Sequence, residues 1–162
     1  MLEQLDGDAA RDSEDIAIRQ ILEEVAAATG MGFAAVARVT ETRWIACQVL
    51  DQIDFGMSPG DELRVSTTIC NDIRESGNAV VIDNVSRDPK WRSHPAPALY
   101  GFKSYVSLPI ILSDGSFYGT LCAIDPEPRK LIGTDIVGTL EAFADRVAAI
   151  LSERLSVGST NE

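Results

Sequence analysis

The segment SYVSLPIILSDGSFYGTLCAID, residues 104–125, carries the strongest structural signal in the chain. Two runs rich in apolar and β-branched residues flank the polar sequence SDGS, residues 113–116, whose Asp-Gly pair is favoured in hairpin turns. We therefore predict two antiparallel strands, over residues 104–112 and 117–125.

Three runs upstream of this hairpin are also predicted as strands. Residues 33–40 and 43–51 are joined by a short polar turn and predict a second hairpin, and residues 78–83 are a compact β-branched run bounded by turn formers. Residues 56–65 carry proline and glycine at turn-forming positions and predict a connecting loop. Residues 84–100 contain three prolines and are predicted to be irregular, although their aromatic content is typical of loops that pack on the core or serve function.

Three helices complete the pattern. Apolar residues at helical spacing predict a first helix from Ser13 to about Gly30 and a long amphipathic helix from Gly133 towards the C-terminus. A short helix over residues 68–76 has candidate capping residues at its start and Gly77 at its end. This order of elements predicts an α+β fold with a central antiparallel sheet of about five or six strands, covered by helices.

The composition is that of one globular domain. The chain has 162 residues, of which 45% are hydrophobic and 24% charged. We predict a frayed N-terminus at residues 1–12, a domain over residues 13–156 and a C-terminal tail at 157–162. No run approaches the roughly 18 apolar residues of a membrane span, and the acidic N-terminus is unlike a signal peptide. We therefore expect a cytoplasmic protein that has no membrane partner.

The charge and the reactive residues argue against several function classes. A net charge of −11 without any Lys/Arg cluster argues against a nucleic-acid partner. His94 is the only histidine, so no metal site of the usual His-pair type and no Ser-His or Cys-His pair is expected. Cys47, Cys70 and Cys122 are far apart, in no zinc or dithiol spacing, and are predicted to be reduced and mostly buried.

Asp83 and Asp125 each end an apolar strand. A carboxylate in this position often accepts hydrogen bonds from the backbone N–H groups of the following turn, and we predict this role for both. No second carboxylate stands at a defined spacing to support catalysis, so the sequence assigns no catalytic residue.

Two stretches resemble a known family. Residues 67–91 (TTICNDIRESGNAVVIDNVSRDPKW) and 100–128 (YGFKSYVSLPIILSDGSFYGTLCAIDPEP) are similar to the core of GAF domains, in particular those found ahead of bacterial histidine kinases and related signalling proteins. The most specific pieces are the strand with a central proline, the Asp-Gly turn and the strand GTLCAID. The resemblance covers residues 16–155. It implies terminal helices packed on one face of the sheet and a pocket on the other, under a short helix and a loop.

The resemblance places the candidate ligand site in that pocket. Its roof would be residues 68–76 and 84–102, and its floor would come from the strands that hold Tyr105, Ser107 and residues 121–123. The candidate ligand-binding residues are Cys70, Trp91, His94, Tyr100, Phe102, Tyr105 and Ser107. Packing of the loop onto the sheet is the alternative role for the aromatic rings, and a local hydrogen bond is the alternative for the histidine.

The resemblance names no cofactor. Bilin-binding GAF domains carry a Cys-His pair before the proline-bearing strand, and the matching pair here is Ser93-His94, so a covalently bound bilin is not expected. GAF domains that reduce free methionine sulfoxide use a loop cysteine that is also missing here, although Cys47 and Cys70 lie near two of their other cysteine positions. The residue pattern of cyclic-nucleotide-binding GAF domains is absent from the sequence.

We predict a sensory or regulatory signal-transduction domain without catalysis of its own, which binds a small molecule or passes a signal through its terminal helices. Two alternatives stay open: a thiol redox sensor or methionine sulfoxide reductase-like enzyme that uses Cys70 at a helix N-terminus, and a purely structural dimerisation domain. The apolar stripe of the last helix continues past the expected body of the domain and predicts a homodimer through the terminal helices. The family implies a downstream signalling output domain as a further partner.

Overall fold

The computed structural model describes residues 16–160, and the side chains of residues 16–154. Its helices are α2 (Ile16–Thr29), α3 (Ile69–Ser76), α4 (Pro95–Tyr100) and α5 (Ile136–Thr160), with short 3₁₀ helices η1 (Val65–Thr67) and η2 (Val85–Arg87). Its strands are β1 (Phe33–Val39), β2 (Trp44–Asp51), β3 (Glu62–Leu63), β4 (Val80–Ile82), β5 (Ser104–Ile111) and β6 (Phe117–Asp125). The frayed segment predicted at residues 1–12 and the predicted helix start at Ser13 lie outside the described residues. Helix α5 reaches Thr160, past the domain boundary predicted at residue 156.

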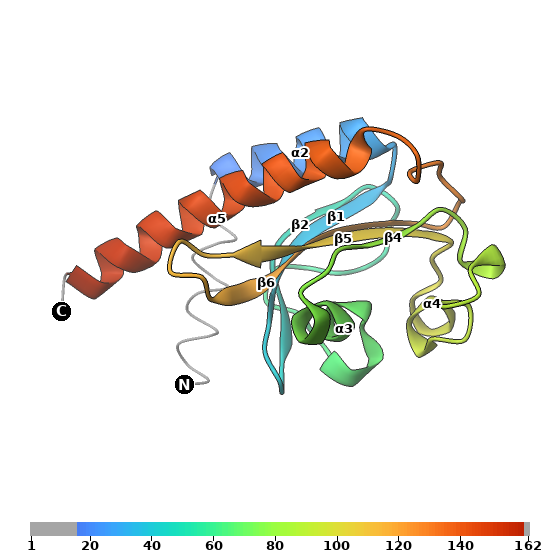
Figure 1. Ribbon diagram of the computed structural model, residues 1–162, viewed down its shortest axis with the longest axis horizontal. Coiled ribbons are helices and arrows are strands. Elements are labelled where there is room, and N and C mark those ends of the chain that lie inside the picture. The colour runs from blue at the N-terminus through green and yellow to red at the C-terminus, as the bar shows by residue number, and fades with distance from the viewer. Residues whose placement is uncertain (1–15, 161–162) are drawn as a thin grey trace.

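The strands form one antiparallel sheet in the order β3-β2-β1-β6-β5-β4 (Figure 1). Both predicted hairpins are confirmed, since β1 pairs with β2 and β5 with β6. The register places Cys122 of β6 opposite Ala35 of β1 on one side and opposite Ser107 of β5 on the other. Cys122 therefore lies in the interior of the sheet, with a neighbouring strand on each side.

Two segments predicted to lack regular structure contain short elements. Residues 56–65 include strand β3, which pairs with β2 at the sheet edge. A two-residue strand is too short to produce a periodic pattern in the sequence. Residues 84–100 contain η2 and α4. Pro95 and Pro97 lie in the first turn of α4, where the N–H groups have no acceptor within the helix, so the prolines start a helix and the prediction of an irregular segment was wrong.

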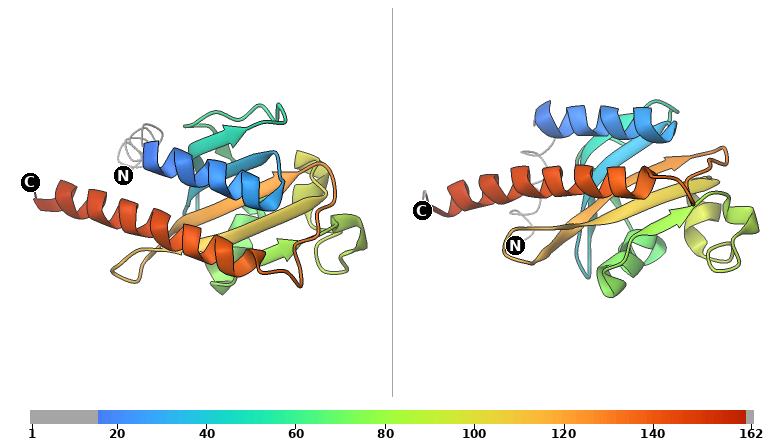
Figure 2. Two further views of the ribbon diagram at one scale, coloured as in Figure 1. Left: turned by 90° about the horizontal axis from the view of Figure 1, so that it is seen from above. Right: turned by 45° about the horizontal axis from the view of Figure 1, so that its top comes forward.

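Helices cover both faces of the sheet and create two cores (Figures 1 and 2). Helices α2 and α5 lie on one face, and α3 and α4 lie on the other. Alternate residues of a strand point to opposite faces. On β5, Val106 and Leu108 pack in the core under α2 and α5, whereas Tyr105 and Ser107 approach Cys70 of α3. This arrangement confirms the predicted α+β fold.

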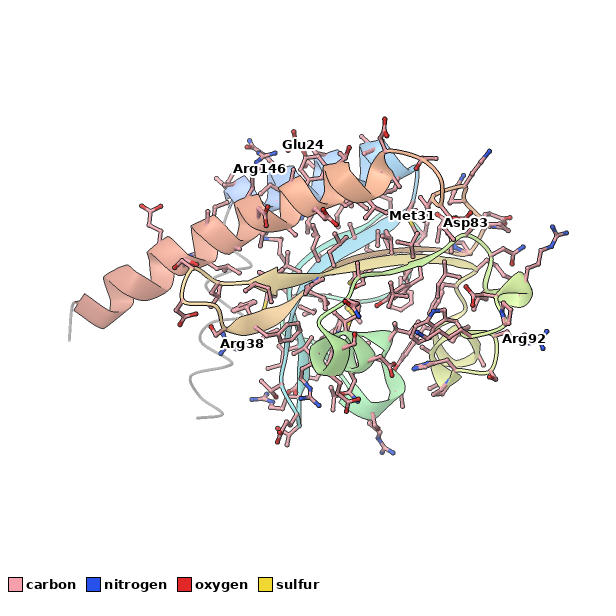
Figure 3. The ribbon with its side chains drawn as sticks, viewed as in Figure 1. Glu24, Met31, Arg38, Asp83, Arg92 and Arg146 are labelled. Atoms are coloured by element: carbon pink, nitrogen blue, oxygen red, sulfur yellow. The ribbon has the colours of Figure 1, made fainter. Side chains whose placement is uncertain are left out.

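The terminal helices run antiparallel to each other across the sheet (Figure 2). An ion pair joins them, with 3.1 Å between Nη1 of Arg146 and Oε2 of Glu24 (Figure 3). The last turns of α5 project beyond the edge of the sheet (Figure 1). Within residues 16–160, no helix is long and apolar enough to cross a membrane.

Both strand-end carboxylates accept backbone hydrogen bonds, but only Asp125 serves the turn that follows it, as predicted; for Asp83 the prediction was wrong, because it binds a distant segment. Oδ1 of Asp83 accepts a hydrogen bond from the N–H of Leu131 at 2.8 Å, which ties the segment before α5 to the end of β4. The carboxylate of Asp125 accepts hydrogen bonds from the N–H groups of Gly32 and Glu127, both at 2.9 Å. The second carboxylate thus holds the connection between α2 and β1 against the end of β6.

Candidate functional site

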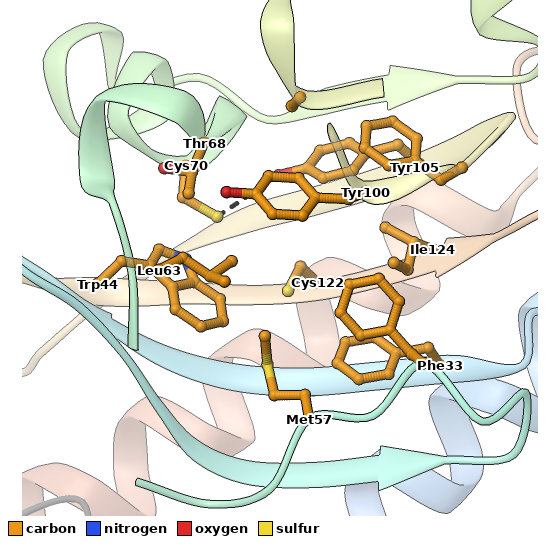
Figure 4. A pocket seen from close by; sticks show the side chains of 13 residues that line it. Phe33, Trp44, Met57, Leu63, Thr68, Cys70, Tyr100, Tyr105, Cys122 and Ile124 are labelled. Atoms are coloured by element: carbon orange, nitrogen blue, oxygen red, sulfur yellow. Dashed lines mark hydrogen bonds between the residues drawn. The ribbon is translucent and has the colours of Figure 1, made fainter. Parts of the chain in front are cut away.

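A small cavity of about 50 Å³ lies between the sheet and the layer formed by α3 and α4 (Figure 4). It occupies the sheet face opposite the terminal helices, where the pocket was predicted. Its walls are mostly apolar and include the rings of Phe33, Trp44, Phe55, Tyr100, Phe102 and Tyr105. Sulfur atoms also reach the cavity, on the side chains of Met57, Cys70 and Cys122.

The predicted site residues divide into those that line the cavity and those that do not. The structure brings four of them to its walls: Cys70, Tyr100, Phe102 and Tyr105. Ser107 is fully buried beside the cavity, with its Oγ 4.0 Å from the sulfur of Cys70. Trp91 and His94 are not among the cavity-lining residues and instead support its roof.

His94 holds α4 in place. Its Nδ1 accepts a hydrogen bond from the N–H of Ala96 at 3.1 Å and caps the helix. Because Nδ1 is an acceptor, the ring proton lies on Nε2, which donates it to Oδ2 of Asp72 at 3.0 Å and so ties α4 to α3. The ring of Trp91 packs beside the imidazole, with 5.5 Å between their centroids. A ligand contact and a local hydrogen bond were the two roles considered for His94, and the structure shows the local hydrogen bond.

Cys70 is held over β5 and β6 by the first turn of α3. Thr68 caps this turn, because its Oγ1 accepts a hydrogen bond from the N–H of Asn71 at 3.3 Å. The sulfur of Cys70 lies 3.1 Å from Oγ1 of Thr120 and 3.5 Å from the hydroxyl of Tyr105. The thiol is therefore surrounded by polar hydrogens although its side chain is only 3% exposed.

These neighbours favour the thiolate form of Cys70. The thiol of Cys122 contributes most to lowering the pKa of Cys70 to about 6. Hydroxyl groups of Thr120 and Tyr105 add to this effect, and burial opposes it. The same contact, together with burial, raises the pKa of Cys122 well above its usual value. The two thiols titrate as a pair, in which Cys70 is the member that ionises more readily.

Trp44 presents an unsatisfied polar group at the cavity. Its side chain is 3% exposed, and Nε1 has no hydrogen-bond partner among the described residues. The indole N–H contributes to the lowered pKa of Cys70, although the two groups form no hydrogen bond. A buried donor without an acceptor costs about 1–3 kcal/mol, so this group favours an additional acceptor atom in the cavity.

The sequence did not reveal that Cys122 meets Cys70. All three cysteines are free and buried, as predicted. Cys47 lies in the core under the terminal helices, whereas the other two share the cavity. The signal that identifies the face of Cys122 is strand alternation, because Thr120, Cys122 and Ile124 point to one side of β6.

One wall of the cavity comes from the N-terminal half of the chain and was not predicted from the sequence. Phe55 and Met57 reach the cavity from the loop after β2. Asp51 fixes this loop, since its Oδ1 accepts a hydrogen bond from the N–H of Phe55 at 2.9 Å. Apolar side chains within a segment rich in turn formers were the only sign of this role in the sequence.

A wider surface depression of about 470 Å³ adjoins the cavity. The two hollows share the side chains of Phe55, Met57, Leu63 and Tyr100, which form the partition between them. The hydroxyl of Tyr100 is 2.6 Å from Oγ1 of Thr67, so one member of the partition is held by a hydrogen bond to η1. We call these four side chains the gate.

The sequence matches the model of a known family, described as the GAF domain, over residues 14–151. The chain belongs to the GAF family. The match spans most of the chain and confirms the resemblance read from residues 67–91 and 100–128. A comparison with curated proteins finds no match.

Solved GAF structures share the fold. The GAF domain of a two-component sensor histidine kinase from Bacillus halodurans superposes with a TM-score of 0.66 at 13% identity, covering 91% of this chain and 98% of that one. The blue-light absorbing form of the PixJ GAF domain of Thermosynechococcus elongatus gives a TM-score of 0.69 at 10% identity, covering 94% and 90%. A type II free methionine-R-sulfoxide reductase from Thermoplasma acidophilum gives 0.65 at 12% identity, covering 92% and 96%. At these identities the likeness establishes the fold, and function has to be argued from the site.

Proposed function

We propose that this GAF domain is a sensory module that binds a small molecule at the cavity and passes the signal to its terminal helices, without catalysis of its own. The observation that carries the proposal is the position of the cavity. Its floor is made by strands whose opposite face packs against α2 and α5. Only the sheet would thus separate a ligand in the cavity from helices α2 and α5.

The gate gives the cavity a way to admit a ligand. A volume of about 50 Å³ is far below the roughly 300–1,000 Å³ of sites for drug-sized molecules. Displacement of the gate side chains would join the cavity to the outer depression, and the combined volume would fall within the range of such sites. The aromatic and sulfur-bearing walls favour a flat, largely apolar ligand with a few acceptor groups for the buried donors.

Alternation along β5 and β6 provides the route to the helices. Tyr105 and Cys122 line the cavity, whereas their chain neighbours Val106 and Leu121 belong to the core under α2 and α5. A ligand that moves the first pair therefore also moves residues that touch the helices. Because packed cores have discrete arrangements, small shifts at such a layer are transmitted as helix displacements.

The proposed partners are a second copy of the chain and a signalling output domain. Both would be engaged through the terminal helices, of which α5 projects from the domain with its last turns (Figure 1). Projecting helices from two copies of a chain commonly pair through their apolar stripes. A purely structural dimerisation domain is the second candidate, and the small volume of the cavity favours it.

A thermal-shift screen with a panel of small metabolites separates the two candidates. Ala96 of α4 lines the cavity and is 2% exposed, so Ala96→Val adds two carbon atoms to the wall. Ala98→Val makes the same change at an exposed position of the same helix. For a sensor, at least one metabolite raises the unfolding temperature of the wild type and of Ala98→Val and has a reduced effect on Ala96→Val. A panel that stabilises neither the wild type nor the control supports the structural domain.

A further inference from the structure

Two thiols from distant parts of the chain meet at the cavity. Cys70 comes from the first turn of α3 and Cys122 from the interior of the sheet, where it is paired with Ser107, whose Oγ lies 4.0 Å from the sulfur of Cys70. Both side chains line the same small space (Figure 4). The two thiols are therefore neighbours at one cavity, which has room for a small reactant.

The groups around Cys70 resemble those that stabilise an anion. Hydroxyls of Thr120, Tyr105 and Ser107 lie 3.1, 3.5 and 4.0 Å from its sulfur. Burial and the charge of Cys70 raise the pKa of Tyr105 well above its usual value, so this hydroxyl keeps its proton and remains a donor. Preorganised donors of this kind stabilise charge without reorganisation at the moment of reaction.

The orphan N–H of Trp44 indicates what the site is missing. It has no acceptor at hydrogen-bonding distance among the described residues, although it acts on the sulfur of Cys70. An oxygen atom bonded to the sulfur, as in a sulfenic acid, would place an acceptor next to this donor. The same holds for the oxygen of a peroxide that approaches the sulfur.

We propose that Cys70 and Cys122 form an oxidisable dithiol, at which a small hydroperoxide reacts to leave a disulfide between α3 and β6. The Cys70 thiolate attacks one peroxide oxygen, the O–O bond breaks, and an alcohol or water leaves after taking up a proton. Cys70 is then a sulfenic acid. The sulfur of Cys122 attacks it, loses its proton, forms the S–S bond and releases water. Two thiols and one hydroperoxide thus give one disulfide, one alcohol or water, and one water.

The charge of Cys70 sets the order of these steps. Before oxidation the anion on Cys70 helps to keep the proton on Cys122. Conversion of Cys70 to a neutral sulfenic acid removes that charge, so Cys122 ionises more readily just when it is needed as the attacking thiol. Disulfide formation requires a sulfur–sulfur distance of about 2 Å, which draws α3 towards β6.

A hydroperoxide fits the observed space. The cavity of about 50 Å³ exceeds the roughly 30 Å³ that one water occupies in the liquid. While the gate side chains stay in place, the two cysteines remain buried and only a small oxidant reaches their sulfurs. The inference concerns the same cavity as the proposed function but needs no bound ligand, since both reacting groups belong to the chain.

Peptide mass spectrometry tests the dithiol directly. The reduced 162-residue chain is treated with hydrogen peroxide, its remaining thiols are blocked with N-ethylmaleimide under denaturing conditions, and it is then digested. The expected product is a linked peptide that contains Cys70 and Cys122, with Cys47 alkylated. From the thiolate fraction and the lower nucleophilicity of an acidic thiol, Cys70 should react at pH 7 about twofold faster than free cysteine, or more.

Variants identify the two roles. In Cys122→Ser, oxidation stops at the sulfenic acid of Cys70, which dimedone traps. In Cys70→Ser, the remaining pair of cysteines forms no disulfide, and Cys47→Ser, altered in the opposite core, behaves like the wild type. Recovery of both cavity thiols as alkylated residues after peroxide, or a rate no faster than that of free cysteine, overturns the proposal. The wild-type measurement decides this even if a variant fails to fold, and a metabolite screen under reducing conditions reports on ligand binding separately.

Discussion

The sulfur of Cys70 lies 3.1 Å from Oγ1 of Thr120, so the first turn of α3 rests directly on the central part of β6. Both side chains are almost completely buried. This contact links the roof of the cavity to a strand that also packs against the terminal helices. A chemical change at the thiol of Cys70 would therefore act directly on β6.

The alkylation rate of Cys70 should follow its lowered pKa. With a pKa of about 6, the thiolate predominates above pH 6 and is lost as the pH falls below it. An ordinary cysteine, with a pKa near 8.5, would still be mostly protonated at pH 7. We expect the rate of iodoacetamide labelling at this residue to rise with a midpoint near pH 6. A midpoint above pH 8 would contradict the proposed role of the surrounding donors.

Replacement of His94 should loosen the roof of the cavity. His94→Ala removes the cap of α4 and the hydrogen bond to Asp72, and loss of a helix cap costs about 1 kcal/mol. His94→Asn retains an acceptor for the cap and should restore part of the loss. Chemical denaturation measures the free energy of unfolding, and hydrogen exchange of residues 95–100 locates the change. Equal stability of the alanine variant and the wild type would argue against this role.

The loop that carries Phe55 should respond to acid. Burial raises the pKa of Asp51, but hydrogen bonds from the N–H groups of Phe55, Gly56 and Ile53 outweigh it, so the pKa lies below its ordinary value of 3.8. The ionised form is thus favoured by folding. Its contribution is present above pH 4 and is lost as the pH falls through the lowered pKa.

Asp51→Asn provides the measurement for this prediction. Its free energy of unfolding should be lower than that of the wild type at pH 7, and the difference should shrink as the pH is lowered below 3.8. A difference that stays constant from pH 7 to acid would mean that the charge of Asp51 does not hold the loop.

A side chain at Gly119 should break the centre of the sheet. A Cβ atom there would overlap the carbonyl oxygen of Ala37 on the neighbouring strand, a contact that backbone atoms cannot relieve cheaply. We expect Gly119→Ala to destabilise the domain by several kcal/mol. The control is Gly138→Ala in α5, where a Cβ meets open space and the helix gains about 0.5–1 kcal/mol. Thermal unfolding of the two variants should move in opposite directions.

Much of the fold could be predicted because its signals are local. The Asp-Gly turn at residues 114–115, the cap at Thr68 and the C-terminal Gly77 of α3 each act within a few residues of the element they define. Strand β3 and helix α4 were not predicted, and the reasons are also local. Strand β3 is too short to show the alternation of a strand, and helix α4 begins with prolines, which usually mark irregular segments.

The site was harder to predict because it depends on contacts between distant segments. The sequence singled out Cys70 but not Cys122, and only the register of β6 and the position of α3 bring the two to one cavity. Trp44 becomes notable only once its N–H is found without a partner. For His94 the sequence left a local hydrogen bond and a ligand contact open, and the structure shows the hydrogen bond that caps α4.

Native mass spectrometry of the freshly purified, reduced protein tests the central claim, that the cavity is a ligand site. A ligand site in the cavity predicts a species that carries additional small-molecule mass, kept by Ala98→Val and diminished or lost in Ala96→Val. Wild-type protein that carries no added mass, both as isolated and after incubation with the metabolite panel, would contradict it.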